Sequence, residues 1–155
     1  MTVNATSNGT INTEDTFVEL ALSNVAIRVK LVRVRLGDGT ATAGLDNDYR
    51  VRLVRKTAAG TGGTGGTEVR KQQAADTPDV VATVKNGATN FTTATLGDIV
   101  DTVVKNGRET FEWIAKDEDD AIITHPTTAS GNIFAVLIQS AVVSQTFQVT
   151  VEWDE

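Results

Sequence analysis

The chain has no cysteine, one histidine, two prolines and few aromatic residues: five Phe, two Trp and one Tyr among 155 residues. The absence of cysteine excludes disulfides, thiolate metal sites and a cysteine nucleophile. Catalysis by proton transfer or nucleophilic attack usually recruits histidine. The single His125 stands beside Pro126 at the end of an expected strand, and we interpret it as a surface loop residue. We therefore predict that the protein is not an enzyme and has no cofactor.

Long apolar runs are also missing. No uninterrupted run approaches the roughly 18 residues needed to span a membrane. The first residues lack the basic and apolar regions of a signal peptide, so we expect synthesis in a cytoplasm and no membrane partner. With 155 residues, 40% of them apolar, the chain is long enough for one domain with its own core.

The strongest structural signal lies near the C-terminus. Residues 133–138 (IFAVLI) are apolar at every position, which is typical of a strand buried on both faces or of a short buried helix. Their β-branched content and the preceding Gly131 and Asn132 favour the strand. Residues 147–153 then alternate apolar and polar side chains, which indicates a half-buried strand. We interpret the two segments as a C-terminal core hairpin.

Two earlier segments are basic and β-like. Residues 25–36 alternate apolar and basic side chains, and the apolar parity changes at Leu31 and Val32. Such a change flips the buried face unless a β-bulge absorbs it, so we predict a bulge or sharp bend there. Residues 49–56 show a similar break at Val54. This similarity suggests two neighbouring strands that share a bend and a basic outer face.

The remaining chain supplies short strands and turns. Asn-Gly is a strong hairpin signal, and it predicts hairpins over residues 79–96 and 99–115. Residues 17–22 and 121–124 are expected as further short strands; residues 96–104 could instead contain one helical turn. About eight or nine strands and no convincing helical period predict an all-β, single-domain β-sandwich of jelly-roll-like topology over 17–155. The polar residues 1–16 are expected to form a flexible or partner-ordered arm.

Charge is distributed unevenly along the chain. Residues 1–71 hold ten Lys and Arg against seven Asp and Glu, whereas residues 72–155 hold four against thirteen, for a net charge of −6. A pI near 4.8 and aromatic residues at core-facing positions argue against nucleic acid as the partner. An acidic protein surface fits the basic strands better. The predicted partner-binding residues are Arg28, Lys30, Arg33, Arg35, Arg50, Arg52 and Arg55.

Two acidic clusters could bind Ca²⁺, because Ca²⁺ prefers carboxylate oxygens on loops. One contains Asp117, Asp119 and Asp120, and the other spans residues 46–48. Neither has the spacing of an EF-hand, and we favour solvated acidic turns, so no metal site is predicted. Residues 58–67 (AAGTGGTGGT) match neither a P-loop nor a dinucleotide-binding fingerprint and are interpreted as a mobile surface loop.

The second half of the chain resembles a known group of proteins. The runs FEWIA (111–115), AIITHP (121–126), GNIFAVLIQSA (131–141) and VTVEWDE (149–155) are similar to the ends of small tailed-bacteriophage virion proteins. In those proteins such segments close a β-sandwich. The resemblance covers residues 109–155, consists mostly of core residues, and includes neither the basic strands nor the Gly/Thr-rich loop.

The resemblance implies a non-enzymatic virion structural protein, made in the host cytoplasm. Its leading form is a capsid decoration (cement) protein that binds the major capsid protein and stabilises the head shell. A homotrimer would suit threefold positions of such a shell. Two alternatives stay open at this point: another head–tail or tail structural component, and a carbohydrate-binding β-sandwich module.

Overall fold

The computed structural model describes residues 2–9, 14–22, 27–36, 48–65, 80–84, 96–124, 133–140 and 145–154. These residues contain strands and connections and no helix, so the all-β prediction is confirmed. The strands are β1 (Thr2–Gly9), β2 (Asp15–Leu22), β3 (Ile27–Leu36), β4 (Asp48–Lys56), β5 (Thr64–Gly65), β6 (Val80–Val84), β7 (Leu96–Asn106), β8 (Phe111–Ile114), β9 (Ile122–Thr124), β10 (Ile133–Ser140) and β11 (Gln145–Asp154).

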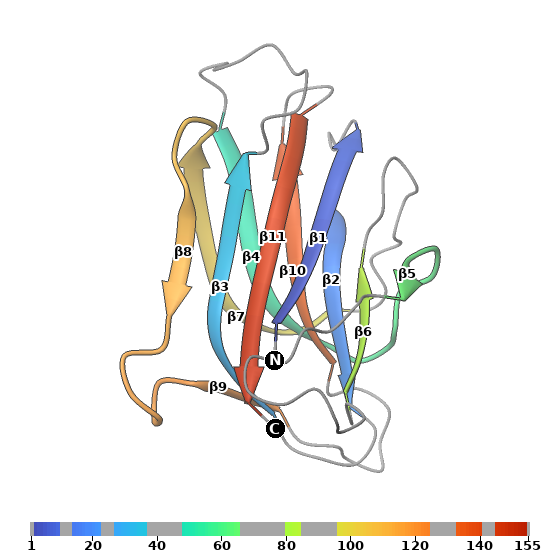
Figure 1. Cartoon of the computed structure of the whole chain (residues 1–155), viewed down its shortest axis with the longest axis vertical. Helices are drawn as coiled ribbons and strands as arrows, with labels where there is room; N and C mark the ends of the chain where they lie inside the picture. Colours follow the sequence, from blue (N-terminus) through green and yellow to red (C-terminus); the bar gives the residue numbers. More distant parts are fainter. Residues whose placement is uncertain are drawn as a thin grey trace.

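The strands form two layers. Sheet A has the order β1-β11-β3-β8, with β9 also paired to β3, and sheet B has the order β5-β6-β2-β10-β4-β7. Figure 1 shows sheet A in front of sheet B. The antiparallel pairs are nested: β1 pairs with β11, β2 with β10, β3 with β8, and β4 with β7. A long hairpin rolled in this way is a jelly roll, and the predicted β-sandwich class is confirmed.

The core lies between the two sheets. Phe147, Val149, Val151 and Trp153 of β11 are at most 1% exposed, and the residues between them face outward, as the alternation predicts. The ring of Phe147 packs against Phe17 with centroids 6.1 Å apart and against Tyr49 at 5.3 Å. Such edge-on and tilted contacts are favourable for aromatic rings.

Strand β10 is buried on both faces, which confirms the interpretation of the apolar run. Alternate residues enter the main core, while Ala135 and Leu137 form a small cluster with Val54 on the outer face of sheet B. The parity break at Val54 therefore reflects burial of both faces of β4. The register between β4 and β10 is continuous at this point, so no bulge against β10 is needed.

The bulge predicted in the first basic strand is present, one residue earlier than expected. Glu152 pairs with Leu31 and the next residue, Trp153, pairs with Val29, so Lys30 is the additional residue of β3. This insertion moves the buried positions of β3 from the parity of Val29 to that of Val32.

Three expectations about neighbouring strands are wrong. The two C-terminal strands form no hairpin, because β10 belongs to sheet B and β11 to sheet A. The strands on either side of Asn106 and Gly107 also separate into different sheets, although a turn closed by Glu109 N donating to Asn106 O (2.8 Å) joins them. The basic strands β3 and β4 are not neighbours either. In a jelly roll most successive strands change layer, which alternation of side chains does not reveal.

The N-terminal segment also differs from the expected arm. Residues 2–9 form β1, which pairs with β11 along its whole length, and the next strand begins at Asp15. Strand pairing uses hydrogen bonds between backbone N–H and C=O groups. A polar segment can therefore add a strand to the edge of a sheet without contributing apolar side chains. The turn of the hairpin expected over 79–96 lies outside the described residues, and β6 pairs with β2 and β5.

Candidate functional site

The seven predicted partner-binding residues do not form one surface. Arg28, Lys30, Arg33 and Arg35 project from β3 in sheet A, whereas the other three belong to β4 in sheet B. The sandwich core separates Arg50 and Arg52 from the β3 group, whereas Arg55 reaches the backbone of β9 in sheet A. Each group therefore has to be considered by the contacts it makes.

The arginines of β4 are tied into the protein itself. Glu14 forms ion pairs with Arg50 (3.2 Å) and with Arg52, whose Nε donates to Glu14 Oε1 at 2.6 Å. The side chains of Arg52 and Glu14 are each only 15% exposed. Arg50 also donates to Gln139, and Arg55 donates to the backbone oxygen of Ile123 at 3.1 Å. The contacts of Arg50 and Arg52 lie on the outer face of sheet B, whereas Arg55, on the core-facing side, connects β4 to β9 of sheet A. All three arginines are thus engaged within the subunit.

A fully buried ion pair lies beside them. Lys56 and Glu19 are in contact, with side chains 0% and 2% exposed. A bulge at Phe17 of β2 places both Thr16 and Glu19 on this outer face, where Lys56 Nζ also reaches Thr16 Oγ1 (3.4 Å). Charged groups withdrawn from water require such pairing. Sequence patterns gave no indication of this pair, because Lys56 and Glu19 come from different strands.

The same carboxylate anchors the Gly/Thr-rich loop. The backbone N–H of Gly60 donates to both oxygens of Glu19, at 3.1 and 3.0 Å. Thr64 and Gly65 then pair with β6 as β5. The loop predicted to be mobile is thus attached to the sheet at Gly60; its last two residues lie outside the described part of the chain.

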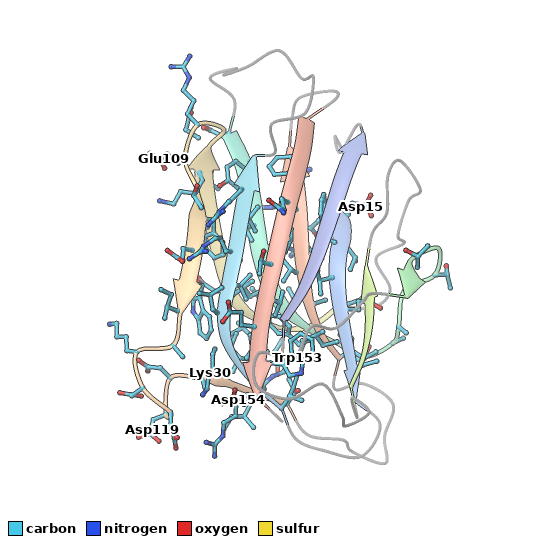
Figure 2. The ribbon with its side chains drawn as sticks, viewed as in Figure 1. Asp15, Lys30, Glu109, Asp119, Trp153 and Asp154 are labelled. Carbon is cyan, nitrogen blue, oxygen red and sulfur yellow. The ribbon has the colours of Figure 1, made fainter. Side chains whose placement is uncertain are left out.

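The cations of β3 lie on the outer face of sheet A, where Arg33 is half-buried and the other three are exposed. Arg28 pairs with Glu118 at 3.2 Å, with side chains 47% and 81% exposed. Lys30 pairs with Asp154 near the end of β11, and Figure 2 labels both residues. Arg33 pairs with Glu112 of β8. Solvent-exposed ion pairs contribute only about 0–1 kcal/mol, so a partner's carboxylates could replace these acids at little cost.

A pocket of about 400 Å³ opens next to the bulge on this face. Leu31, Ile114 and Ala121 give it an apolar lining, and Arg28, Glu118 and Glu152 add charge. The connection after β8 is held against β3 here, because Ala115 N donates to Lys30 O at 3.0 Å. Apolar lining combined with mixed charge suits a protein segment better than it suits a reaction centre.

The acidic residues considered as Ca²⁺ ligands form a hydrogen-bonded turn. The Asp117 carboxylate accepts hydrogen bonds from the backbone N–H groups of Asp119 and Asp120, both at 3.0 Å, so it closes the acidic turn. Among the described residues no three acidic or histidine side chains gather closely enough to hold a metal ion. His125 and residues 46 and 47 lie outside those residues.

A second exposed feature lies at one edge of the sandwich. Ile99, Val100 and Val104 of β7 are 54%, 39% and 59% exposed, and Ile114 of β8 is 56% exposed. Sequence reasoning located these strands, but it could not tell that β7 and β8 each occupy the end of a sheet. Edge position depends on the complete strand order.

Comparison with known proteins finds no matching family model, no matching curated protein and no matching solved structure. Within the described part of the chain, no helix has the length and apolar character needed to cross a membrane. Function must therefore be argued from the geometry above.

Proposed function

We propose that this chain is a non-enzymatic structural protein of a tailed-bacteriophage virion, namely a capsid decoration (cement) protein that binds the assembled head shell. The observation that carries the proposal is the outer face of sheet A. There, four cations project from one strand and two of them, Arg28 and Lys30, line an apolar pocket, on a jelly-roll scaffold of the kind found in viral capsid domains. The scaffold contributes by analogy only, since one fold serves many functions.

The contacts favour sheet A, rather than sheet B, as the docking face. Arg28, Lys30, Arg33 and Arg35 are exposed or half-buried, and their acidic partners are exposed as well. Acidic groups of the major capsid protein would take the place of these intramolecular partners. The pocket beside Lys30 would accept an apolar side chain from the shell. Arg50, Arg52 and Arg55 are left out of the docking face because their contacts stabilise the subunit itself.

Stabilisation of the shell would follow from mass action. A protein that binds only the assembled shell shifts the equilibrium between assembled and separated capsid subunits toward assembly. Because many copies bind one particle, a modest affinity per copy can produce a large effect. Binding through exchanged ion pairs would weaken as salt concentration rises.

The burial of aromatic side chains speaks against the carbohydrate-binding alternative. Six of the seven aromatic residues in the described part of the chain are at most 4% exposed, and Trp113 is half-buried. Sugar-binding faces on β-sandwiches rely on exposed aromatic rings, and no such patch occurs among these residues.

The test is co-sedimentation with heads assembled from the major capsid protein encoded in the same genome. The variant Arg33→Glu/Arg35→Glu should lower shell occupancy at least tenfold, because it places acids where the shell is acidic. The matched control compares the single variant Arg35→Glu with Arg108→Glu, which makes the same charge change at an exposed turn position that does not line the pocket. Equal occupancy for both variants would overturn the docking face. Absence of wild-type protein from the shell, with presence on tails, would assign the chain to another virion position.

A further inference from the structure

Within the described part of the chain, one edge of strand β7 has no strand partner, although the backbone N–H of Thr102 donates to Asp101 Oδ1 at 2.7 Å. Among the described strands it pairs with β4 alone, and it is eleven residues long. Its exposed apolar residues, Ile99, Val100 and Val104, lie along this edge strand. Soluble proteins normally shorten, charge or cover such edges, because unpaired backbone groups accept a further strand.

The register with β4 defines the two faces of β7. Val103 opposes the buried Val51 and so faces the core, whereas Thr102 opposes Arg52 on the outer face. The register then shifts: Leu53 pairs with Asp101, but Val54 pairs with Ile99, which leaves Val100 as an additional residue. This bulge returns Ile99 to the outer face that Thr102 and Val104 share.

We propose that β7 pairs in antiparallel with β7 of a second copy of this chain, with Thr102 opposite Thr102 on a twofold axis. If the additional residue Val100 is left out of the pairing, Val104 of each copy comes opposite Ile99 of the other. Lys105 of each copy then comes opposite Asp98 of the other. In every pair the two side chains lie on the same face of the extended sheet. This match requires the additional residue Val100, which places Asp101 and Ile99 on opposite faces of β7.

Chemical complementarity selects a second copy as the occupant. Two strongly exposed apolar residues, Ile99 and Val104, cover one another, and a cation meets an anion twice in each interface. Directly opposed apolar and opposite-charge pairs stabilise antiparallel sheets. Lys105 now pairs with Glu109 of its own chain at 3.4 Å, but this contact is exposed and can be exchanged. The charges of β7 therefore favour this register and oppose others.

The contact is isologous, so it produces a dimer by twofold symmetry. It replaces the trimer expected from the sequence. It also leaves the docking face of sheet A uncovered, because β7 belongs to sheet B. The inference does not depend on the proposed virion function, and either can fail without the other.

A charge-swap series measured by light scattering tests the pairing. The wild-type chain should form a dimer. Asp98→Lys places Lys against Lys105, and Lys105→Asp places Asp against Asp98, so each single variant should raise the dimer dissociation constant at least tenfold. The double variant Asp98→Lys/Lys105→Asp restores opposite charges and should recover most of the affinity. A wild-type monomer, a trimer, or a dimer indifferent to both single changes would overturn the proposal.

Cross-linking locates the axis. Because the chain has no cysteine, Thr102→Cys introduces a single thiol. Directly opposed strand residues have Cα atoms about 4.5–5.5 Å apart, which suits a disulfide. Mild oxidation should therefore convert Thr102→Cys to a covalent dimer much faster than the control Thr110→Cys, which is exposed beyond the end of β7. Equal rates for the two variants would refute pairing centred on Thr102.

Discussion

The ammonium group of Lys56 contacts the carboxylate of Glu19 on the outer face of sheet B, where both side chains are withdrawn from water. The Glu19 carboxylate also accepts the backbone N–H of Gly60, so one acidic side chain joins β2, β4 and the Gly/Thr-rich loop. The outer surface of this sheet is therefore built from paired charges over a small apolar cluster. This contact has consequences that mutagenesis can measure.

Replacing Lys56 by Met should destabilise the protein strongly. The substitution leaves the buried Glu19 charge without its cation, which typically costs about 3–5 kcal/mol in the free energy of unfolding. The double variant Lys56→Met/Glu19→Gln buries no charge and should lose less than the sum of the two single changes. Urea denaturation measures all three. A loss below about 1 kcal/mol for Lys56→Met would contradict burial of the pair.

The two groups of arginines should differ in their contribution to stability. Arg52→Met removes the closer of the two arginine contacts of the mostly buried Glu14 and should cost about 1–3 kcal/mol. Arg28→Met breaks an exposed ion pair with Glu118 and should change stability by no more than about 0.5 kcal/mol. Parallel urea titrations of the two variants provide the measurement. Equal losses in the free energy of unfolding would contradict the difference in burial between the Arg28–Glu118 and Arg52–Glu14 ion pairs.

Tyr49 should titrate abnormally. Burial, helped by the nearby charge of Glu109 and opposed by a backbone hydrogen bond with Phe111, raises the pKa of Tyr49 to about 12. Its hydroxyl donates to the backbone oxygen of Glu109 at 2.7 Å. As the chain has one tyrosine, tyrosinate absorbance reports this group alone. We expect ionisation near pH 12 in the folded protein and near pH 10 in urea.

The same shift predicts a loss of stability in alkali. The unfolded chain releases the tyrosine proton near pH 10, whereas the folded protein keeps it until about pH 12. The free energy of unfolding should therefore fall as pH rises between these values, and the stabilisation that comes from Tyr49 is fully present below pH 10. Tyr49→Phe should remove this pH dependence while keeping the ring packed on Phe147. An unchanged alkaline profile in that variant would contradict the assignment.

Gly97 should not tolerate a side chain. A Cβ atom at this position would lie 2.7 Å from the backbone oxygen of Arg55, and a backbone atom cannot move away at low cost. Gly97→Ala should therefore lower the free energy of unfolding by about 1–3 kcal/mol. The control is Thr110→Ala, an exposed position beyond the end of β7. Similar stability of both variants would indicate that the edge of β7 is more adaptable than the structure implies.

Individual strands were predictable because burial leaves a periodic trace along the chain. The alternation before Trp153 and the apolar run that forms β10 both correspond to the observed burial. The parity change near Leu31 located the bulge to within one residue, since an additional residue must flip the buried face. In these cases the information is local, and neighbouring residues are enough to carry it.

The partners of each strand were not predictable in the same way. The Asn106–Gly107 turn joins two sheets, although the residue pair alone indicates a hairpin. The basic residues of β3 and β4 looked alike in sequence, yet those of β3 pair with exposed acids, whereas Arg52 and Lys56 of β4 pair with acids that are largely buried. Glu14 and Glu19 determine that difference, and both lie far from β4 in the chain.

The sequence by itself determined that this protein is an all-β sandwich, which residues of β10 and β11 are buried, and, to within one residue, where β3 bulges, because side-chain periodicity follows directly from strand geometry. Only the tertiary structure decided which sheet receives each strand, which cations are neutralised inside the subunit, and that β7 lies at an edge. Those properties depend on contacts between residues distant in sequence. The strand order of the two sheets brings such residues together, and no local pattern encodes that order.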